Sequence, residues 1–190
     1  MNTCNISLVG VGGQGILLSS DVLVRAAMLA GLDAKKAEVH GMSQRGGSVI
    51  SQVRFGEKVF SPIVGNADSD ILVSFDRLEA LRYRPLIKPD GVALVNNADI
   101  VPTTVSSGMQ PAVADLDGEL KKAFPKLVLV DALTIATGLG NAKCANVVLT
   151  GALSKLLDFP LDLWLEALRG RVPAKLLDLN LKAFELGRNA

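Results

Sequence analysis

Six residues near the N-terminus, Gly10 to Gly15, have the spacing G-x-G-x-x-G and lie between two apolar segments. Glycines at such positions permit a tight turn and let the backbone approach a ligand closely. If a helix begins directly after the turn, its first amide groups offer free donors and partial positive charge to a phosphate or carboxylate. The turn therefore predicts an anion-binding loop, with Gly12, Gly13, Gln14 and Gly15 as candidate contacts.

A second glycine-rich segment runs from His40 to Gly47 and combines five small or polar residue types. Glycines on both sides of Arg45 leave its guanidinium unobstructed, and this planar fork suits a carboxylate or a phosphate. The candidate contacts here are His40, Ser43, Gln44, Arg45, Gly46 and Gly47. A purely structural turn, with Arg45 capping backbone carbonyls, would use the same residues, so both interpretations stay open at this point.

Classical dinucleotide binding needs an acidic residue at the end of the second strand, where it would hold a ribose hydroxyl. Asp33 comes too early for this role, and Glu38 is followed by Val39 rather than by a clean strand end. A strand–helix turn with a role other than dinucleotide binding fits better. One histidine and the distant Cys4 and Cys144 also assemble no nucleophilic constellation.

Composition excludes several other classes. The chain has 190 residues, enough for one domain, with 20 Lys+Arg against 19 Asp+Glu and a net charge of +1, so no broad basic face for nucleic acid is expected. Two cysteines exclude a four-cysteine cluster and a disulfide framework, and reduced thiols in the cytoplasm are expected. No signal segment or membrane span is predicted.

The elements that must position these residues follow from hydrophobic periodicity. Strands are predicted at 5–9, 34–39, 48–55, 70–74, 91–95 and 127–130. Helices are predicted at 14–30, 77–82, 116–124, 131–140, 145–157, 161–168 and 174–186. A turn at Gly56 and Glu57 predicts that residues 58–61 return as the second arm of a hairpin, and residues 96–111 form a long loop.

Alternating strands and helices predict an α/β fold. We expect a Rossmann-like, mostly parallel sheet flanked by helices, with a β-hairpin insertion after the second strand and a C-terminal helical extension. The chain would be a single domain, 1–190, with an α/β core at 1–140 and a helical tail at 141–190. The first and last helices are apolar around most of their circumference, which favours a partner on one side.

The motifs resemble a known family. The segments Gly10 to Leu17 and His40 to Ser48 resemble the gamma-type module of 2-oxoacid:ferredoxin oxidoreductases, and the string from Glu38 to Ser48 is similar to the branch that acts on indolepyruvate. The tail supports the likeness through residues 145–153, 171–173 and 180–188. The resemblance extends from about Ile6 to Arg188.

The resemblance implies oxidative decarboxylation of a 2-oxoacid, here an arylpyruvate, to an acyl-coenzyme A, with electrons passed to ferredoxin. Thiamine diphosphate, Mg and [4Fe-4S] clusters would reside in a large alpha subunit, and coenzyme A would be the co-substrate. This chain lacks the thiamine signature, because Asp90-Gly91 stands too close to Asn96-Asn97. We therefore expect no catalytic residue here, no cofactor bound by this chain alone and no activity in isolation. Its partners would be the alpha subunit and, through it, ferredoxin, with neither nucleic acid nor membrane.

The expected contribution is to complete the active site of the large subunit. Both glycine-rich segments would line the pocket where the oxoacid carboxylate or the coenzyme A phosphates approach thiamine diphosphate, with Arg45 as the anion contact. Two alternatives stay open: a free-standing Rossmann-type nucleotide-binding protein, and a purely structural adaptor that touches no ligand.

Overall fold

A computed structural model describes residues 3–40, 47–101 and 103–190, apart from the side chains of His40, Thr103 and Thr104. The strands are β1 (Cys4–Val11), β2 (Asp33–His40), β3 (Ser48–Gly56), β4 (Ser69–Ser74), β5 (Ile87–Asn96) and β6 (Leu127–Val130). The α-helices are α1 (Ile16–Leu29), α2 (Arg77–Arg82), α3 (Thr103–Ser106), α4 (Leu116–Ala123), α5 (Ala132–Gly138), α6 (Ala145–Ser154), α7 (Leu161–Arg169) and α8 (Ala174–Arg188). Two short 3₁₀ helices are η1 (Arg84–Leu86) and η2 (Ala142–Cys144).

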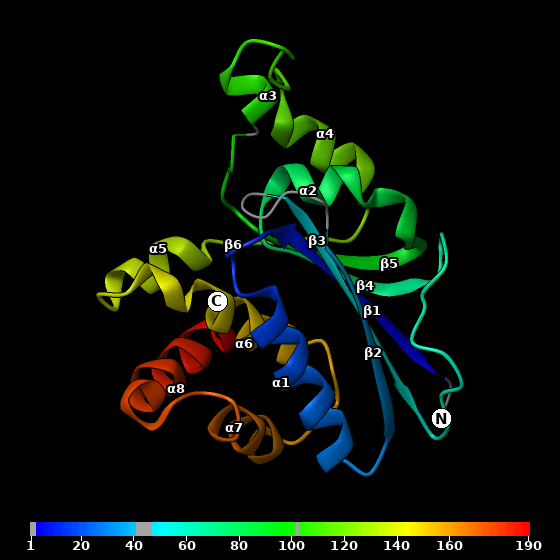
Figure 1. The fold of residues 1–190 in the computed structure, drawn as a ribbon, viewed down its shortest axis with the longest axis vertical. Helices are drawn as coiled ribbons and strands as arrows, with labels where there is room; N and C mark the ends of the chain where they lie inside the picture. The colour runs from blue at the N-terminus through cyan, green and yellow to red at the C-terminus, as the bar shows by residue number, and fades with distance from the viewer. Residues whose placement is uncertain (1–2, 41–46, 102) are drawn as a thin grey trace.

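The six strands form one sheet in the order β2-β3-β1-β4-β5-β6. β1, β4, β5 and β6 run parallel, while β3 runs antiparallel to both of its neighbours. Helices cover both faces: α2 and α4 lie on one, and α1 with α5 to α8 lies on the other (Figure 1). The predicted fold class, a mostly parallel α/β sheet between helices, is confirmed.

Side chains of the central strands alternate between two hydrophobic cores. On β4, Ile71 and Val73 join the larger cluster on the α1 side, and Leu72 joins the smaller cluster under α2 and α4. Because both faces are buried, these strands read as continuous apolar runs rather than as alternating ones. The larger cluster includes Leu8 of β1 and Phe184 of α8, so the tail helices share a core with the sheet.

The predicted second hairpin arm is wrong. Residues 58–61 form no strand, because β1 and β2 already occupy both edges of β3. Side chains hold the following segment instead: Val64 N donates to Gln52 Oε1 at 3.2 Å, and Gln52 Nε2 donates to the Val64 carbonyl at 2.9 Å. The hairpin in this fold is made by β2 and β3, which pair antiparallel from Asp33 opposite Gly56 to His40 opposite Val49.

The apolar circumference of α1 also has a different explanation from the one expected. We predicted that a partner covers its second side, but α6 and α7 of the same chain pack there. Helices α6 and α8 approach very closely through two glycines, because a Cβ on Gly187 would lie 2.8 Å from Val148 Cα and one on Gly151 would lie 3.0 Å from the Phe184 carbonyl carbon. The tail thus supplies most of the missing cover.

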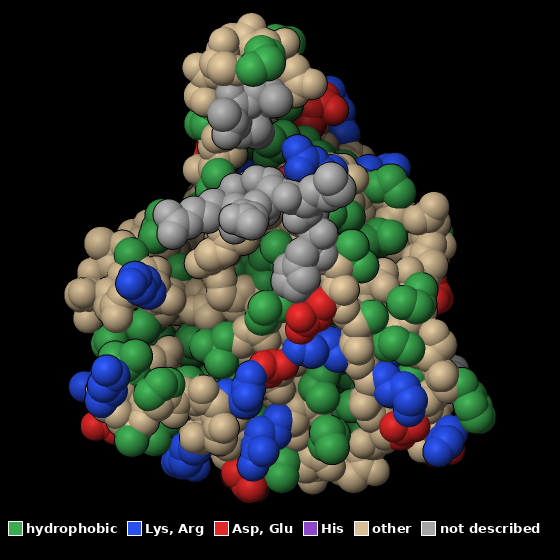
Figure 2. Space-filling view, in the orientation of Figure 1, with side chains coloured by type: hydrophobic (Ala, Val, Ile, Leu, Met, Phe, Trp, Pro, Cys, Tyr) green, Lys and Arg blue, Asp and Glu red, His purple; other side chains and the backbone are tan. Residues whose placement is uncertain are grey.

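Charge on the viewed face is mixed. In Figure 2, lysine and arginine side chains alternate with aspartate and glutamate over the lower half of this face, among hydrophobic side chains. Within the part of the chain that the structure describes, no helix has both the length and the apolar character that crossing a bilayer requires.

Candidate functional site

A cleft of about 530 Å³ lies at the carboxyl edge of the parallel strands. Parallel strands place their carboxyl ends along one sheet edge, and the crevice there is where ligands bind in open α/β sheets. The β1–α1 turn, the ends of β4 and β5, and the starts of α5 and α6 contribute its walls. Its lining residues are Gly13, Gln14, Gly15, Phe75, Asn96, Ala98, Asp99, Ile100, Leu133, Ala142, Lys143, Ala145 and Asn146.

Gln14 braces the glycine-rich turn from inside. Its Oε1 accepts a hydrogen bond from Val11 N at 2.6 Å, and its Nε2 donates to the Phe75 carbonyl at 3.0 Å. A Cβ on Gly10 would collide with this side chain and would lie 2.8 Å from Phe75 Cβ. The first glycine is therefore required because the brace passes directly over it.

Gly15 is the N-cap of α1 and adopts left-handed backbone dihedrals, with φ at 82°. A Cβ there would lie 2.8 Å from Asn146 Cγ, while Asn146 Nδ2 donates to the Gly15 carbonyl at 3.3 Å. Helix α1 has no side-chain cap and no acidic residue in its first turn. The first turn of α1 therefore supplies no side chain that compensates the positive end of the helix dipole.

Asn96 extends the brace across the sheet edge. Its Nδ2 donates to the same Phe75 carbonyl at 3.1 Å, and its Oδ1 accepts a bond from Ala132 N at 3.1 Å. Two amides therefore tie the ends of β1, β4, β5 and β6 together. These hydrogen bonds form the floor of the cleft.

The second glycine-rich segment reaches the first at its far end, where Gly12 N donates to the Gly47 carbonyl at 2.9 Å. Ser48, the next residue, bonds to Glu79 Oε2 and lies 2.9 Å from Tyr83 Oη. The structure thus brings the described ends of the two segments together, as expected if both line one pocket. The proposed contacts Ser43, Gln44, Arg45 and Gly46, and the side chain of His40, lie outside the described residues.

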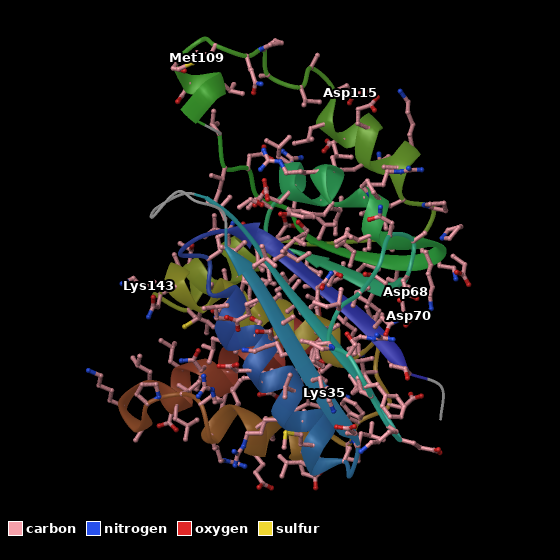
Figure 3. All side chains as sticks on the ribbon, turned by 45° about the vertical axis from the view of Figure 1, so that its right-hand side comes forward. Lys35, Asp68, Asp70, Met109, Asp115 and Lys143 are labelled. Carbon is pink, nitrogen blue, oxygen red and sulfur yellow. The ribbon has the colours of Figure 1, made fainter. Side chains whose placement is uncertain are left out.

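The cleft wall carries two charged side chains among the described residues. Asp99 accepts two hydrogen bonds from Arg77, the Nε bond at 2.7 Å, and this guanidinium lowers the pKa of the Asp99 carboxyl. Lys143 stands in η2, at the start of the helical segment that continues into α6. Figure 3 shows it beside the blue β1–α1 turn, far from Asp68 and Asp70 at the amino end of β1.

Asp76 is a buried acid beneath the turn. It caps α2, with Oδ1 accepting from Glu79 N at 2.9 Å, and its Oδ2 has no hydrogen-bond partner among the described residues. Burial, together with the nearby Glu79 charge, raises the pKa of Asp76 to about 6, against the opposing effect of the Glu79 amide bond. Asp76 is thus the N-cap residue of α2.

The described residues supply no ligand set for an iron–sulfur cluster or for the metal of a bound diphosphate. Cys4 lies at the start of β1 and Cys144 in η2, and both thiols are free. Burial raises the pKa of Cys4 to about 12 and also raises that of Cys144, which disfavours the thiolate that a metal needs. Across residues 3–40, 47–101 and 103–190, no three His, Cys, Asp or Glu side chains gather as a metal site.

The strand order weighs against classical dinucleotide binding. β3 lies between β1 and β2, so the second strand stands two spacings, about 10 Å, from the glycine turn. Glu38, the acid considered for a ribose, pairs with Lys36 at 2.5 Å. The turn and this carboxylate therefore belong to separate parts of the sheet edge.

Sequence reasoning found part of the cleft and missed the rest. Gly13, Gln14 and Gly15 line it, whereas Gly12 lies beside it and bonds to Gly47. Asn96 and Asn146 were missed, although a polar residue at the carboxyl end of a buried strand is a usable signal for Asn96. No local pattern indicated Lys143, because its place depends on how η2 packs.

The comparisons with known proteins agree with this architecture. The sequence profile described as pyruvate ferredoxin/flavodoxin oxidoreductase matches residues 5–190. Indolepyruvate oxidoreductase subunit IorB of Thermococcus kodakarensis is 43% identical over 195 residues, covering 100% of this chain and 96% of that protein. The IorB subunit of Archaeoglobus fulgidus is 39% identical over 189 residues, covering 97% and 94%.

Two solved structures share the fold. Pyruvate oxidoreductase subunit PORC of Thermotoga maritima superposes with a TM-score of 0.75 at 20% identity, covering 100% of this chain and 97% of that one. The 2-oxoglutarate:ferredoxin oxidoreductase of Magnetococcus marinus, solved with 2-oxoglutarate, coenzyme A and succinyl-CoA bound, superposes with a TM-score of 0.74 at 21% identity, covering 100% and 31%. Because the profile and the full-length relatives match nearly every residue, this chain belongs to the pyruvate ferredoxin/flavodoxin oxidoreductase family.

Proposed function

We propose that this chain is the small, non-autonomous subunit of a thiamine-diphosphate-dependent 2-oxoacid:ferredoxin oxidoreductase that acts on indolepyruvate or a related arylpyruvate. The observation that carries the proposal is the full-length identity of 43% and 39% to two indolepyruvate oxidoreductase subunits. Their coverage of more than nine-tenths of both chains supports a shared role rather than a shared domain alone.

We assign the thiamine diphosphate, its Mg and the [4Fe-4S] clusters to a large partner subunit. The two free cysteines of this chain have raised pKa values, and its described residues bring together no metal-ligating group. On this proposal, the group that stabilises the carbanion and the centres that carry electrons come from the partner. A cytoplasmic location suits the two unpaired thiols.

The part of this chain is to complete the site for the oxoacid or for coenzyme A. The cleft at the carboxyl edge supports this role, because it has rigid walls and an α1 N-terminus without an acidic residue in its first turn. Backbone amides there suit a carboxylate or phosphate. Arg45, between its glycines, stays the proposed contact from the second segment.

The experiment compares this chain alone, the large chain alone and the reassembled complex under anaerobic conditions. The complex is expected to reduce ferredoxin with indolepyruvate and coenzyme A, with thiamine and iron found only in the large chain. Turnover, iron or thiamine in the isolated small chain would overturn the proposal. A panel of aryl, branched-chain and dicarboxylate oxoacids identifies the preferred substrate.

The same experiment separates the two alternatives. An adaptor would raise the stability of the large chain. The reassembled complex would then have the same KM for both co-substrates as the large chain alone. A free-standing nucleotide-binding protein would bind NAD, FAD or AMP as an isolated chain. The strand order gives little support to this alternative, because β3 separates β2 from β1.

A further inference from the structure

The cleft wall carries a cation that no sequence motif singled out. Among its described lining residues, Lys143 is the one cationic side chain and Asp99 the one carboxylate. Arg77 neutralises Asp99 through a two-point contact, with a further bond from Arg77 Nη1 to Asp117 at 2.5 Å. Asp99 is thus held in an ion pair, whereas Lys143 has no ion-pair partner among the described residues.

Lys143 stands where a cation is electrostatically disfavoured. It lies in the first turn of the helical segment formed by η2 and α6, and α6 has no acidic residue in its own first turn. A positive side chain at a helix N-terminus carries an electrostatic cost, because it faces the positive end of the helix dipole. Lys143 is exposed and has no ion-pair partner among the described residues, so nothing described in this chain offsets that cost.

The position of Lys143 is nevertheless well defined. Asn141 Oδ1 accepts a bond from Lys143 N at 3.1 Å, and Cys144 N donates to the Asn141 carbonyl at 3.0 Å. The backbone of η2 is thus held at the cleft, whose lining it shares with the glycine turn. Phe75, Ile100 and Leu133 add apolar surface to the same lining.

We propose that Lys143 is a specificity-determining residue of this cleft, recognising an anionic group, carboxylate or phosphate, on a ligand with an apolar or extended body. This inference rests on the proposed function, in which the cleft receives the oxoacid or coenzyme A. The carboxylate of an aryl oxoacid and the phosphates of coenzyme A share this chemistry. The apolar wall holds the body of the ligand, and the ammonium selects its charged end.

The test uses the reassembled complex carrying the wild-type chain or Lys143→Gln, Lys143→Arg or Lys155→Gln. Lys155 is an exposed lysine at the other end of α6 and lies outside the cleft, so it controls for the loss of one charge. For Lys143→Gln we expect a rise of about tenfold in one KM, since a charge-assisted hydrogen bond is lost, with kcat retained. Lys143→Arg should restore the wild-type KM, and Lys155→Gln should not change it.

Separate titrations identify the anion. A raised KM for indolepyruvate assigns the carboxylate, and a raised KM for coenzyme A assigns a phosphate. Dephospho-coenzyme A then tests the 3′-phosphate. In the wild-type complex this KM should also rise with salt, because added ions screen the pair, and the salt dependence should weaken in Lys143→Gln. Unchanged values of both KM in Lys143→Gln overturn the inference.

A further variant, Leu133→Trp, separates two negative outcomes: that Lys143 does not recognise the ligand, and that the cleft does not bind the ligand at all. Leu133 is partly exposed in the cleft, so a larger side chain there fills the cavity without disturbing the core. A raised KM in Leu133→Trp with none in Lys143→Gln keeps the cleft as the ligand site and removes Lys143 from it. Unchanged KM values in both variants contradict the cleft role as well.

Discussion

Gln14 and Asn96 donate to one and the same acceptor, the carbonyl oxygen of Phe75, at 3.0 and 3.1 Å. The first residue belongs to the turn after β1 and the second ends β5, so their shared acceptor at the end of β4 joins three strands. The oxygen of the same amide, Asn96 Oδ1, accepts a hydrogen bond from Ala132 N. This bond connects the segment after β6 to the same group of strand ends. The floor of the cleft is therefore a hydrogen-bonded unit rather than a set of independent loops.

Replacing Asn96 with alanine should lower the free energy of unfolding by about 1–3 kcal/mol, because Ala132 N loses its acceptor in a buried site. Asn97→Ala is the matched control, since Asn97 donates to Asp131 at an exposed position and should cost less than about 0.5 kcal/mol. Urea unfolding measures both. A double-mutant cycle with Gln14→Ala should be non-additive, and strict additivity would contradict a shared unit.

Gly15→Ala should destabilise the chain more than Gly31→Ala. Both glycines have nearly the same left-handed φ, 82° and 80°, but only a Cβ on Gly15 meets the Asn146 side chain, whereas nothing lies within 4 Å of one on Gly31. Gly31→Ala thus measures backbone strain alone, about 1–2 kcal/mol. Thermal or urea unfolding compares them, and equal losses would show that contact with Asn146 has no energetic weight.

Gly187→Ala should separate α8 from α6. Its Cβ would collide with the Val148 backbone, 2.8 Å from Cα, so the loss should exceed about 2 kcal/mol, in the range for overpacking. Gly138→Ala near the end of α5 meets nothing within 4 Å and should be neutral or stabilising by up to about 1 kcal/mol. Equal behaviour of the two variants in urea unfolding would mean that this helix contact is dispensable.

The order and type of most elements could be predicted, because the buried central strands and the amphipathic helices have distinct periods. Pairing could not be predicted in the same way. The segment from Lys58 has a strand-like composition after a glycine turn, yet both edges of β3 are taken by strands from elsewhere in the chain. A hydrophobic pattern indicates which residues suit a strand. It does not indicate which edge of a neighbouring strand is free for pairing.

In the candidate site too, the residues that a local pattern marks could be predicted, and those placed by packing could not. Gly13, Gln14 and Gly15 were predictable because glycine spacing is a local signal for a turn at a helix start. Asn146 and Lys143 reach the cleft only through the packing of α6 against α1, which no local pattern records. Gln14 was predicted as a ligand contact, and the structure adds a bracing role for it that depends on Phe75, a residue far along the chain.

Asp76→Asn should remove a pH-dependent loss of stability. Burial raises the pKa of Asp76 from its usual 3.8 to about 6. The protonated carboxyl therefore contributes its full share to the free energy of unfolding below pH 3.8, and this share is lost as pH rises through about 6. At about 1.4 kcal/mol per pKa unit, the loss is about 3 kcal/mol. Asparagine caps a helix equally well and stays neutral, so the wild-type chain should lose stability relative to the variant between pH 4 and about 7.

Asp99→Asn is the control for that titration. Arg77 lowers the pKa of Asp99, so the stability that this carboxylate contributes is present above pH 3.8 and is lost only as pH falls below it. Its difference from wild type should stay constant between pH 5 and 8. A constant difference for Asp76→Asn over the same range, in urea unfolding at several pH values, would show that Asp76 titrates normally.

Hydrogen exchange of the intact complex, with and without coenzyme A or the oxoacid, tests the central role of the cleft most directly. The two wall segments to follow are residues 12–18 and 142–147, which carry the glycine turn with the start of α1 and the start of α6. We expect at least one of the two ligands to slow exchange in both segments, while β2 and the end of α8 stay unchanged. Unaltered exchange in both segments at saturating concentrations of each ligand, in a complex that is turning over, would contradict a ligand site in this chain.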